Sequence, residues 1–89
     1  MRKFSFEGKL EKTLQKIFEK DRQLYEIVMK KVREIIECED VEHYKNLRAP
    51  LAHLKRVHIR GPFVLIFKYE KPQDKTIFYD LDHHDGIYF

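Results

Sequence analysis

The spacing of hydrophobic residues changes twice along the first half of the chain. Residues 2–7 alternate between polar and apolar side chains, which is typical of a short strand, and Gly8 ends the pattern. Over residues 9–20 and again over 22–37, apolar residues recur at helical spacing. Asp21, between these stretches, is predicted to cap the second helix. The pattern therefore predicts a strand followed by two antiparallel helices joined by almost no linker.

The second half alternates at the period of strands. After a predicted loop over residues 38–50, residues 54–60 place Val57 and Ile59 on one side of a strand. The other side would carry the basic residues Arg56, His58 and Arg60. Gly61 and Pro62 predict a tight turn.

Two further strands are expected after this turn. The nearly continuous apolar run over residues 63–69 is typical of a central strand buried on both faces. Residues 70–74 form a predicted hairpin loop, and residues 76–82 alternate again, with Ile77, Tyr79 and Leu81 expected to point inward. The predicted fold is α+β with the order β-α-α-β-β-β, in which a helical hairpin covers one face of a mainly antiparallel four-stranded sheet. The opposite face is expected to be free.

Length and composition limit the class of protein. The 89 residues suffice for one domain, 1–89, and 43% hydrophobic with 37% charged residues excludes a disordered chain. The longest apolar run, residues 63–67, is far shorter than the ~20 residues that cross a bilayer. No signal peptide is recognisable, and the single cysteine, Cys38, cannot form an internal disulfide. We therefore expect a cytoplasmic protein that does not bind membranes.

Positive charge is concentrated in one segment. Residues 43–69 contain six Lys and Arg residues and no Asp or Glu, so this segment has a formal charge of +6. The whole chain has a net charge of +3, so the remaining residues sum to −3. Within this segment, Arg56, His58 and Arg60 would form a row with about 7 Å between neighbours. Arginine binds phosphate bidentately, and histidine changes charge near neutral pH. The pattern favours an anionic partner such as RNA, with an ordinary solvated strand face as the alternative.

Asp and His residues cluster near the carboxyl end, at Asp80, Asp82, His83, His84 and Asp85. Adjacent histidines on an extended segment point to opposite sides and no spaced ligand set is present, so we expect no metal and no cofactor. One histidine could face the basic row as an acid or base while the terminal aromatic residue stacks on a nucleobase. Alternatively, Ile87 and Tyr88 simply pack into the core.

Two sequence blocks resemble a known family. Residues 54–69, LKRVHIRGPFVLIFKY, and residues 84–88, HDGIY, are similar to the RelE/ParE superfamily of toxins from type II toxin–antitoxin systems. Within it the chain looks closest to YafQ-like and archaeal RelE-like members. The resemblance implies a metal-independent endoribonuclease that cleaves mRNA in the ribosomal A site by attack of the ribose 2′-hydroxyl on the neighbouring phosphate. It also implies a cognate antitoxin, RelB-like or DinJ-like, in a toxin–antitoxin hetero-oligomer.

The resemblance also suggests roles for individual residues. His58 and His84 would be the catalytic acid and base, in either order, and Tyr88 would stack on a base. The remaining RNA-binding positions would be Lys55, Arg56, Arg60 and Phe63.

Three positions depart from the family pattern. Ala49 replaces a histidine and Pro62 an aspartate of YafQ-like toxins, and Val64 stands where many RelE toxins have a catalytic arginine. Two alternatives therefore stay open. One is a ParE-like toxin that binds a protein target such as gyrase, and the other is a catalytically degenerate relative that only binds RNA.

Overall fold

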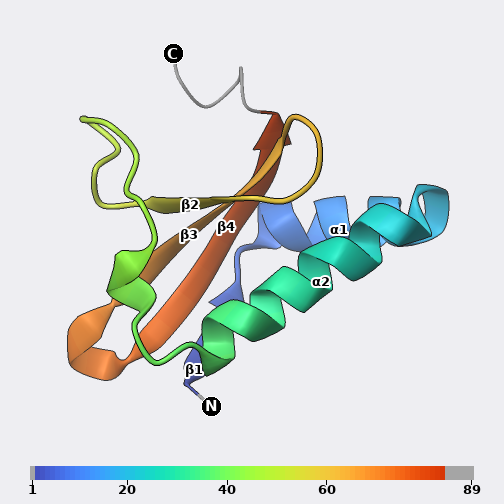
Figure 1. Ribbon diagram of the computed structural model, residues 1–89. Helices are drawn as coiled ribbons and strands as arrows, with labels where there is room; N and C mark the ends of the chain where they lie inside the picture. The colour runs from blue at the N-terminus through green and yellow to red at the C-terminus, as the bar shows by residue number, and fades with distance from the viewer. Residues whose placement is uncertain (1, 84–89) are drawn as a thin grey trace.

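The computed structural model describes residues 2–83, with side chains to residue 82. The strands are β1 (Lys3–Phe6), β2 (Lys55–His58), β3 (Phe63–Glu70) and β4 (Lys75–His83); the helices are α1 (Gly8–Lys20) and α2 (Arg22–Glu37), with short 3-10 turns η1 (Val41–His43) and η2 (Lys71–Gln73). The predicted order of strands and helices is confirmed. Figure 1 shows both helices on one side of the sheet, with the chain between η1 and β2 looping out at the other side.

The helical hairpin turns at Asp21, as the sequence predicts. The Asp21 carboxylate accepts a hydrogen bond from the Leu24 N–H at 3.1 Å, which caps α2, while its own N–H donates to the Ile17 carbonyl at the end of α1. Both helices bury the apolar stripe that their spacing indicated; its buried members are Leu10, Leu14, Leu24, Val28, Val32, Ile35 and Ile36. Phe18 lies in the last turn of α1, next to the Asp21 junction, and stays exposed. In the described part of the chain, neither helix is long and apolar enough to cross a membrane.

The four strands form one sheet in the order β1-β4-β3-β2. β1 pairs parallel with β4, and the other two pairings are antiparallel, so the sheet is mainly antiparallel as expected. The parallel pair is possible because the helical hairpin and two further strands lie between β1 and β4 along the chain. At the β2 edge, the Arg56 N–H donates to the Lys45 carbonyl at 3.0 Å, so the loop before β2 partly covers this edge.

The sheet separates two hydrophobic clusters. The larger cluster lies under the helices and includes Leu65, Phe67, Phe78 and Leu81. The smaller one lies on the opposite side of the sheet, called here the far face, and consists of Leu47, Leu54, Val64 and Ile66 with Tyr79 packed against it. Since residues 64–67 are all buried, β3 is the doubly buried central strand that the apolar run predicted. The far face is not entirely free, because the loop before β2 contributes Leu47 and Leu54 to it.

The inward side of β4 differs from the prediction. Phe78 is completely buried under the helices and Tyr79 packs against the far-face cluster, which is the reverse of the expected phase. The register of β4 against β3 shifts between Ile66 and Phe67, where Ile66 pairs with Asp80 and Phe67 with Phe78. This β-bulge adds one residue to β4 and reverses the alternation, so Leu81 is inward as predicted while Tyr79 is not.

Candidate functional site

The far face brings together two of the basic residues singled out by the sequence. In β2, Arg56 pairs with Ile66 and His58 pairs with Val64. Directly paired residues of antiparallel strands point to the same face, so Arg56 and His58 both lie on the far face beside its apolar cluster. His58 is exposed and Arg56 is half-buried. An imidazole and a guanidinium therefore share one accessible surface.

Carboxylates line the other side of this surface. Across the sheet, Val64 pairs with Asp82 and Ile66 with Asp80, so both aspartates share the far face with His58. Two strand spacings put the backbones of His58 and Asp82 about 10 Å apart. Asp80 forms an ion pair with Lys9 at 3.0 Å, and this hydrogen-bonded contact raises the pKa of Lys9. The sequence placed these aspartates in the carboxyl-terminal cluster, but only the strand register shows that they lie opposite β2.

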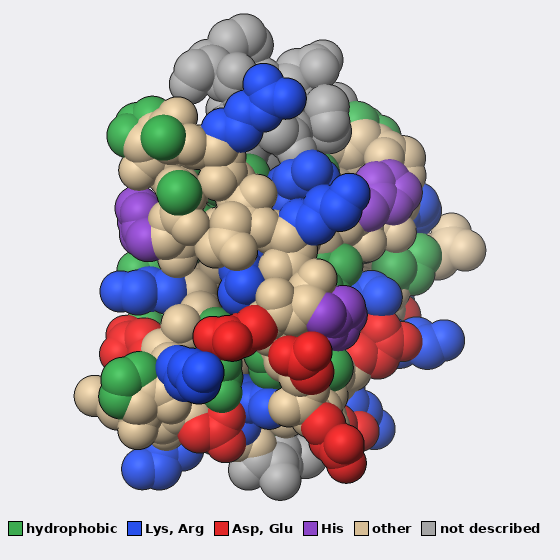
Figure 2. Space-filling view, turned by 60° about the vertical axis from the view of Figure 1, so that its left-hand side comes forward, with side chains coloured by type: hydrophobic (Ala, Val, Ile, Leu, Met, Phe, Trp, Pro, Cys, Tyr) green, Lys and Arg blue, Asp and Glu red, His purple; other side chains and the backbone are tan. Residues whose placement is uncertain are grey.

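The charge of this region is visible on the molecular surface. Figure 2 shows Lys and Arg side chains over the whole of the face in view, whereas the Asp and Glu side chains visible there lie in the lower half. This position of the acidic side chains agrees with the uneven charge along the sequence, where residues 43–69 hold six basic and no acidic residues. A surface with a cationic half is suited to a polyanion.

Arg60 does not continue the row of Arg56 and His58. β2 ends at His58, and the following turn directs the Arg60 guanidinium toward the helical hairpin, where it binds the Asp21 carboxylate at 2.8 Å. The hydrogen bond from Arg60, followed by the one from the Leu24 N–H, lowers the pKa of Asp21. The expected row of three with no neutralising carboxylate is therefore wrong at its third member, because the regular strand stops too early.

Lys55 and Phe63 also face away from the far face. The Lys55 side chain is buried, and its ammonium donates to the Tyr44 carbonyl and to the Asn46 side-chain oxygen, both at 3.0 Å. It thus holds the loop before β2 in place. Phe63 packs against the large core cluster on the helix side. The other two candidates, His84 and Tyr88, lie outside the described residues.

His58 makes a hydrogen bond that the sequence could not reveal. Its Nε2–H donates to the Gly61 carbonyl in the following turn at 2.6 Å. Because a carbonyl only accepts, the proton of the neutral ring is on Nε2 and the basic nitrogen is Nδ1. The ring is therefore fixed in orientation and tautomer by its own turn, which suits an acid or base.

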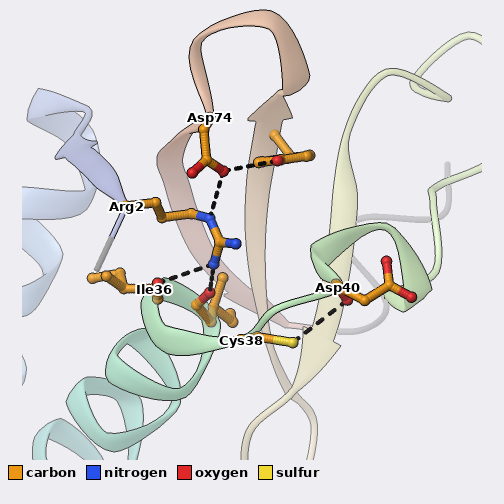
Figure 3. A network of polar contacts seen from close by, with 7 residues as sticks. Arg2, Ile36, Cys38, Asp40 and Asp74 are labelled. Carbon is orange, nitrogen blue, oxygen red and sulfur yellow. Dashed lines mark hydrogen bonds and ion pairs between the residues drawn. The ribbon is translucent and has the colours of Figure 1, made fainter.

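A second polar network lies at the end of the molecule where β1 starts (Figure 3). The Arg2 guanidinium donates to the carbonyls of Ile35 and Ile36 at the end of α2, at 2.7 and 3.0 Å, and to Asp74 at 3.0 Å. The Tyr69 hydroxyl also donates to Asp74. The contact with Arg2, then that with Tyr69, lowers the pKa of Asp74, and the bond to Asp74 raises the pKa of Tyr69. Since Arg2 is almost completely buried, this network joins α2 to the β3–β4 turn and is structural.

Figure 3 also shows the contact from Cys38 to Asp40 beyond the end of α2. The Cys38 thiol donates to the Asp40 carbonyl at 3.4 Å, and the His43 ring bonds to the same carbonyl. Among the described residues, no three His, Cys, Asp or Glu side chains are grouped closely enough to hold a metal ion. The far face is thus the best candidate site in the described part of the chain.

Known proteins share both the sequence and the fold. A protein of Methanocaldococcus jannaschii assigned as the toxin RelE4 is 46% identical over 79 residues, which is 89% of this chain and 82% of that protein. This chain belongs to the RelE superfamily of toxins. An uncharacterised protein of Methanosarcina mazei is 41% identical over 81 residues, or 91% of this chain and 92% of the relative. No family model matches the chain.

Solved structures extend the likeness to the fold of more distant toxins. The toxin–antitoxin complex RelBE2 of Mycobacterium tuberculosis contains a chain that superposes with a TM-score of 0.74 at 18% identity, covering 92% of this chain and 96% of that chain. YafQ of Escherichia coli gives a TM-score of 0.66 at 13% identity over the full length of both chains. Two helices on a four-stranded mixed sheet are therefore the fold of RelE-like toxins, as the sequence resemblance implied.

Proposed function

We propose that this RelE-superfamily toxin is a metal-independent endoribonuclease that cleaves mRNA in the ribosomal A site. The observation that carries the proposal is that His58 and Arg56 lie together on the accessible far face. Cleavage by the ribose 2′-hydroxyl needs a base at that oxygen, a cation near the phosphorane and an acid at the leaving 5′-oxygen. An imidazole with a defined basic nitrogen beside a guanidinium supplies two of these three groups.

The positions of His58 and Arg56 support the roles proposed for them. His58 takes or gives a proton through Nδ1, because Nε2 is engaged with the Gly61 carbonyl. Arg56 stabilises the charge that develops on the phosphate. His84 is the second acid–base group and Tyr88 stacks on a base, both as the family resemblance implies. Val64, where many RelE toxins carry an arginine, is buried on the far face, and we assign the cationic role to Arg56 on the neighbouring strand.

The proposal includes an antitoxin. Several solved structures similar to this fold are toxin–antitoxin complexes, including RelBE of Escherichia coli and YoeB-YefM of Staphylococcus aureus. We expect an antitoxin whose disordered or helical segment folds as it binds the helical hairpin and sheet, with acidic residues that meet residues 43–69. Hydrogen exchange of the toxin with and without its antitoxin tests this. Protection confined to parts of the toxin outside residues 43–69 would contradict the acidic contact.

Inducible expression tests the nuclease function. The wild type, the His58→Ala, His84→Ala double variant and a His53→Ala control are expressed, and growth and mRNA 5′ ends are followed. His53 is exposed in the loop before β2 and has no assigned role. We expect new mRNA 5′ ends within translated codons in the wild type and the His53→Ala control. These ends should be absent from the His58→Ala, His84→Ala double variant. Growth arrest without cleavage, unchanged in the double variant, would instead favour a ParE-like toxin with a protein target.

A further inference from the structure

The turn that holds His58 is itself tightly defined. The Phe63 N–H donates to the Arg60 carbonyl at 2.9 Å, which closes a four-residue turn with Gly61 and Pro62 at its centre. Gly61 has φ +54, a value that favours glycine, and proline cannot adopt a positive φ. A positive φ at the first central residue only is the pattern of a type II′ turn, which suits a hairpin. The Gly61 carbonyl that binds His58 belongs to this turn.

The same turn is fastened to the other side of the sheet. Arg60, its first residue, reaches the Asp21 carboxylate at 2.8 Å, and Asp21 lies at the junction of α1 and α2. Because Asp21 also caps α2 through the Leu24 N–H, its carboxylate is fixed by the helix as well as by the ion pair. A continuous chain of polar contacts thus runs from the helical hairpin through Arg60 and the turn to the His58 ring.

We propose that Asp21 is a positioning residue for His58. Through Arg60 it fixes the β2–β3 turn, whose Gly61 carbonyl holds His58 with the proton on Nε2 and the basic Nδ1 free to serve the reaction. The inference rests on the catalytic function proposed for His58 above. It also replaces the phosphate-binding role expected for Arg60 from the sequence by a structural one.

The two roles for Arg60 predict opposite effects of Asp21→Asn. Asparagine caps helices as well as aspartate does, so the variant keeps the cap of α2 and loses only the charge that holds Arg60. If Arg60 positions the turn, loss of its partner slows cleavage. If Arg60 instead binds RNA, release from Asp21 frees a cation and strengthens RNA binding.

The tautomer of His58 tests positioning without any need for activity. Nitrogen-15 NMR of the imidazole distinguishes the two neutral tautomers. We expect His58 of the wild type to carry its proton on Nε2, and we expect Asp21→Asn and Arg60→Gln to mix the tautomers to the same extent. The Asp21→Asn, Arg60→Gln double variant should mix the tautomers no more than either single variant does, since both substitutions break the same chain of contacts. Glu19→Gln, which removes an exposed acid of α1, is the matched control and should leave His58 unchanged.

Kinetics complete the test. For single-turnover cleavage of mRNA held on ribosomes, Asp21→Asn should lower the maximal rate about tenfold with little change in the half-saturating concentration, within the ~100-fold that a small misplacement of a reacting group can cost. His58 signals that do not change in folded Asp21→Asn, or tighter RNA binding at an undiminished rate, would overturn the inference. If the wild type cleaves no RNA, the proposed nuclease function fails, and the NMR result still decides whether Asp21 controls the His58 ring.

Discussion

The helix-covered face of the sheet and the far face use the same strands for different purposes. Under the helices, β3 and β4 contribute fully buried side chains such as Leu65, Phe67 and Phe78 to one large apolar cluster. On the far face, a small cluster of four buried residues lies beside Arg56, His58 and the aspartates of β4. Stability is therefore concentrated on one face, which leaves the other able to present charged groups. Polar residues are costly in a core but ordinary on a surface.

Adjacent residues of β3 test this division most strongly. Leu65 points to the helices and Ile66 to the far face, and mutation to alanine removes the same number of carbon atoms from each. We expect Leu65→Ala to cost about 4 kcal/mol in free energy of unfolding and Ile66→Ala about 2 kcal/mol, since the smaller cluster can relax into the space. Urea unfolding measures both values. Equal losses would show that the two faces stabilise the fold alike.

The Arg2 network should be the next most important contribution. Arg2→Met removes the donors to the Ile35 and Ile36 carbonyls and to Asp74, and should cost about 2 kcal/mol because hydrogen bonds from a charged group, two of them partly buried, are lost. Arg33→Met is the control, since Arg33 is exposed and forms no ion pair among the described residues. Thermal unfolding should separate the two variants clearly, and similar melting temperatures would contradict a structural role for Arg2.

The same network predicts a dependence of stability on pH. The folded-state pKa of Asp74 is lowered by Arg2 and then by Tyr69, so its contribution to stability is present above the unfolded value of about 3.9 and is lost as the pH falls through the folded value. Asp74→Asn should therefore flatten the loss of stability between about pH 5 and 2. Parallel curves for the variant and the wild type over this range would count against the assignment.

Thr76 should give the smallest effect. Its hydroxyl is completely buried and has no hydrogen-bond partner among the described atoms. Thr76→Val replaces an unsatisfied polar group with a methyl group of similar shape, so the change should be neutral or stabilising by up to about 1 kcal/mol. A destabilisation of that size, measured by urea unfolding, would show that the hydroxyl has a partner after all.

Sequence patterns predicted the fold where local rules apply. Capping depends on neighbouring residues, so the sequence predicts the Asp21 cap. Alternation holds within a strand, so the sequence also predicts that Arg56 and His58 share one face. The pattern failed at Arg60, beyond the strand end, and at Tyr79, where a bulge reverses the phase. The sequence predicts Lys55 as a phosphate ligand, whereas in the structure it binds Tyr44 and Asn46, which come from a loop whose path the sequence does not specify.

The far face is the proposed catalytic surface, and one matched pair of variants tests this role most directly. Purified His58→Ala and His53→Ala proteins, both shown to be folded, are compared with the wild type in cleaving mRNA on ribosomes. Loss of an acid–base group should slow cleavage by at least about 100-fold for His58→Ala, and His53→Ala should cleave at the wild-type rate. Cleavage by His58→Ala at the wild-type rate would contradict the claim.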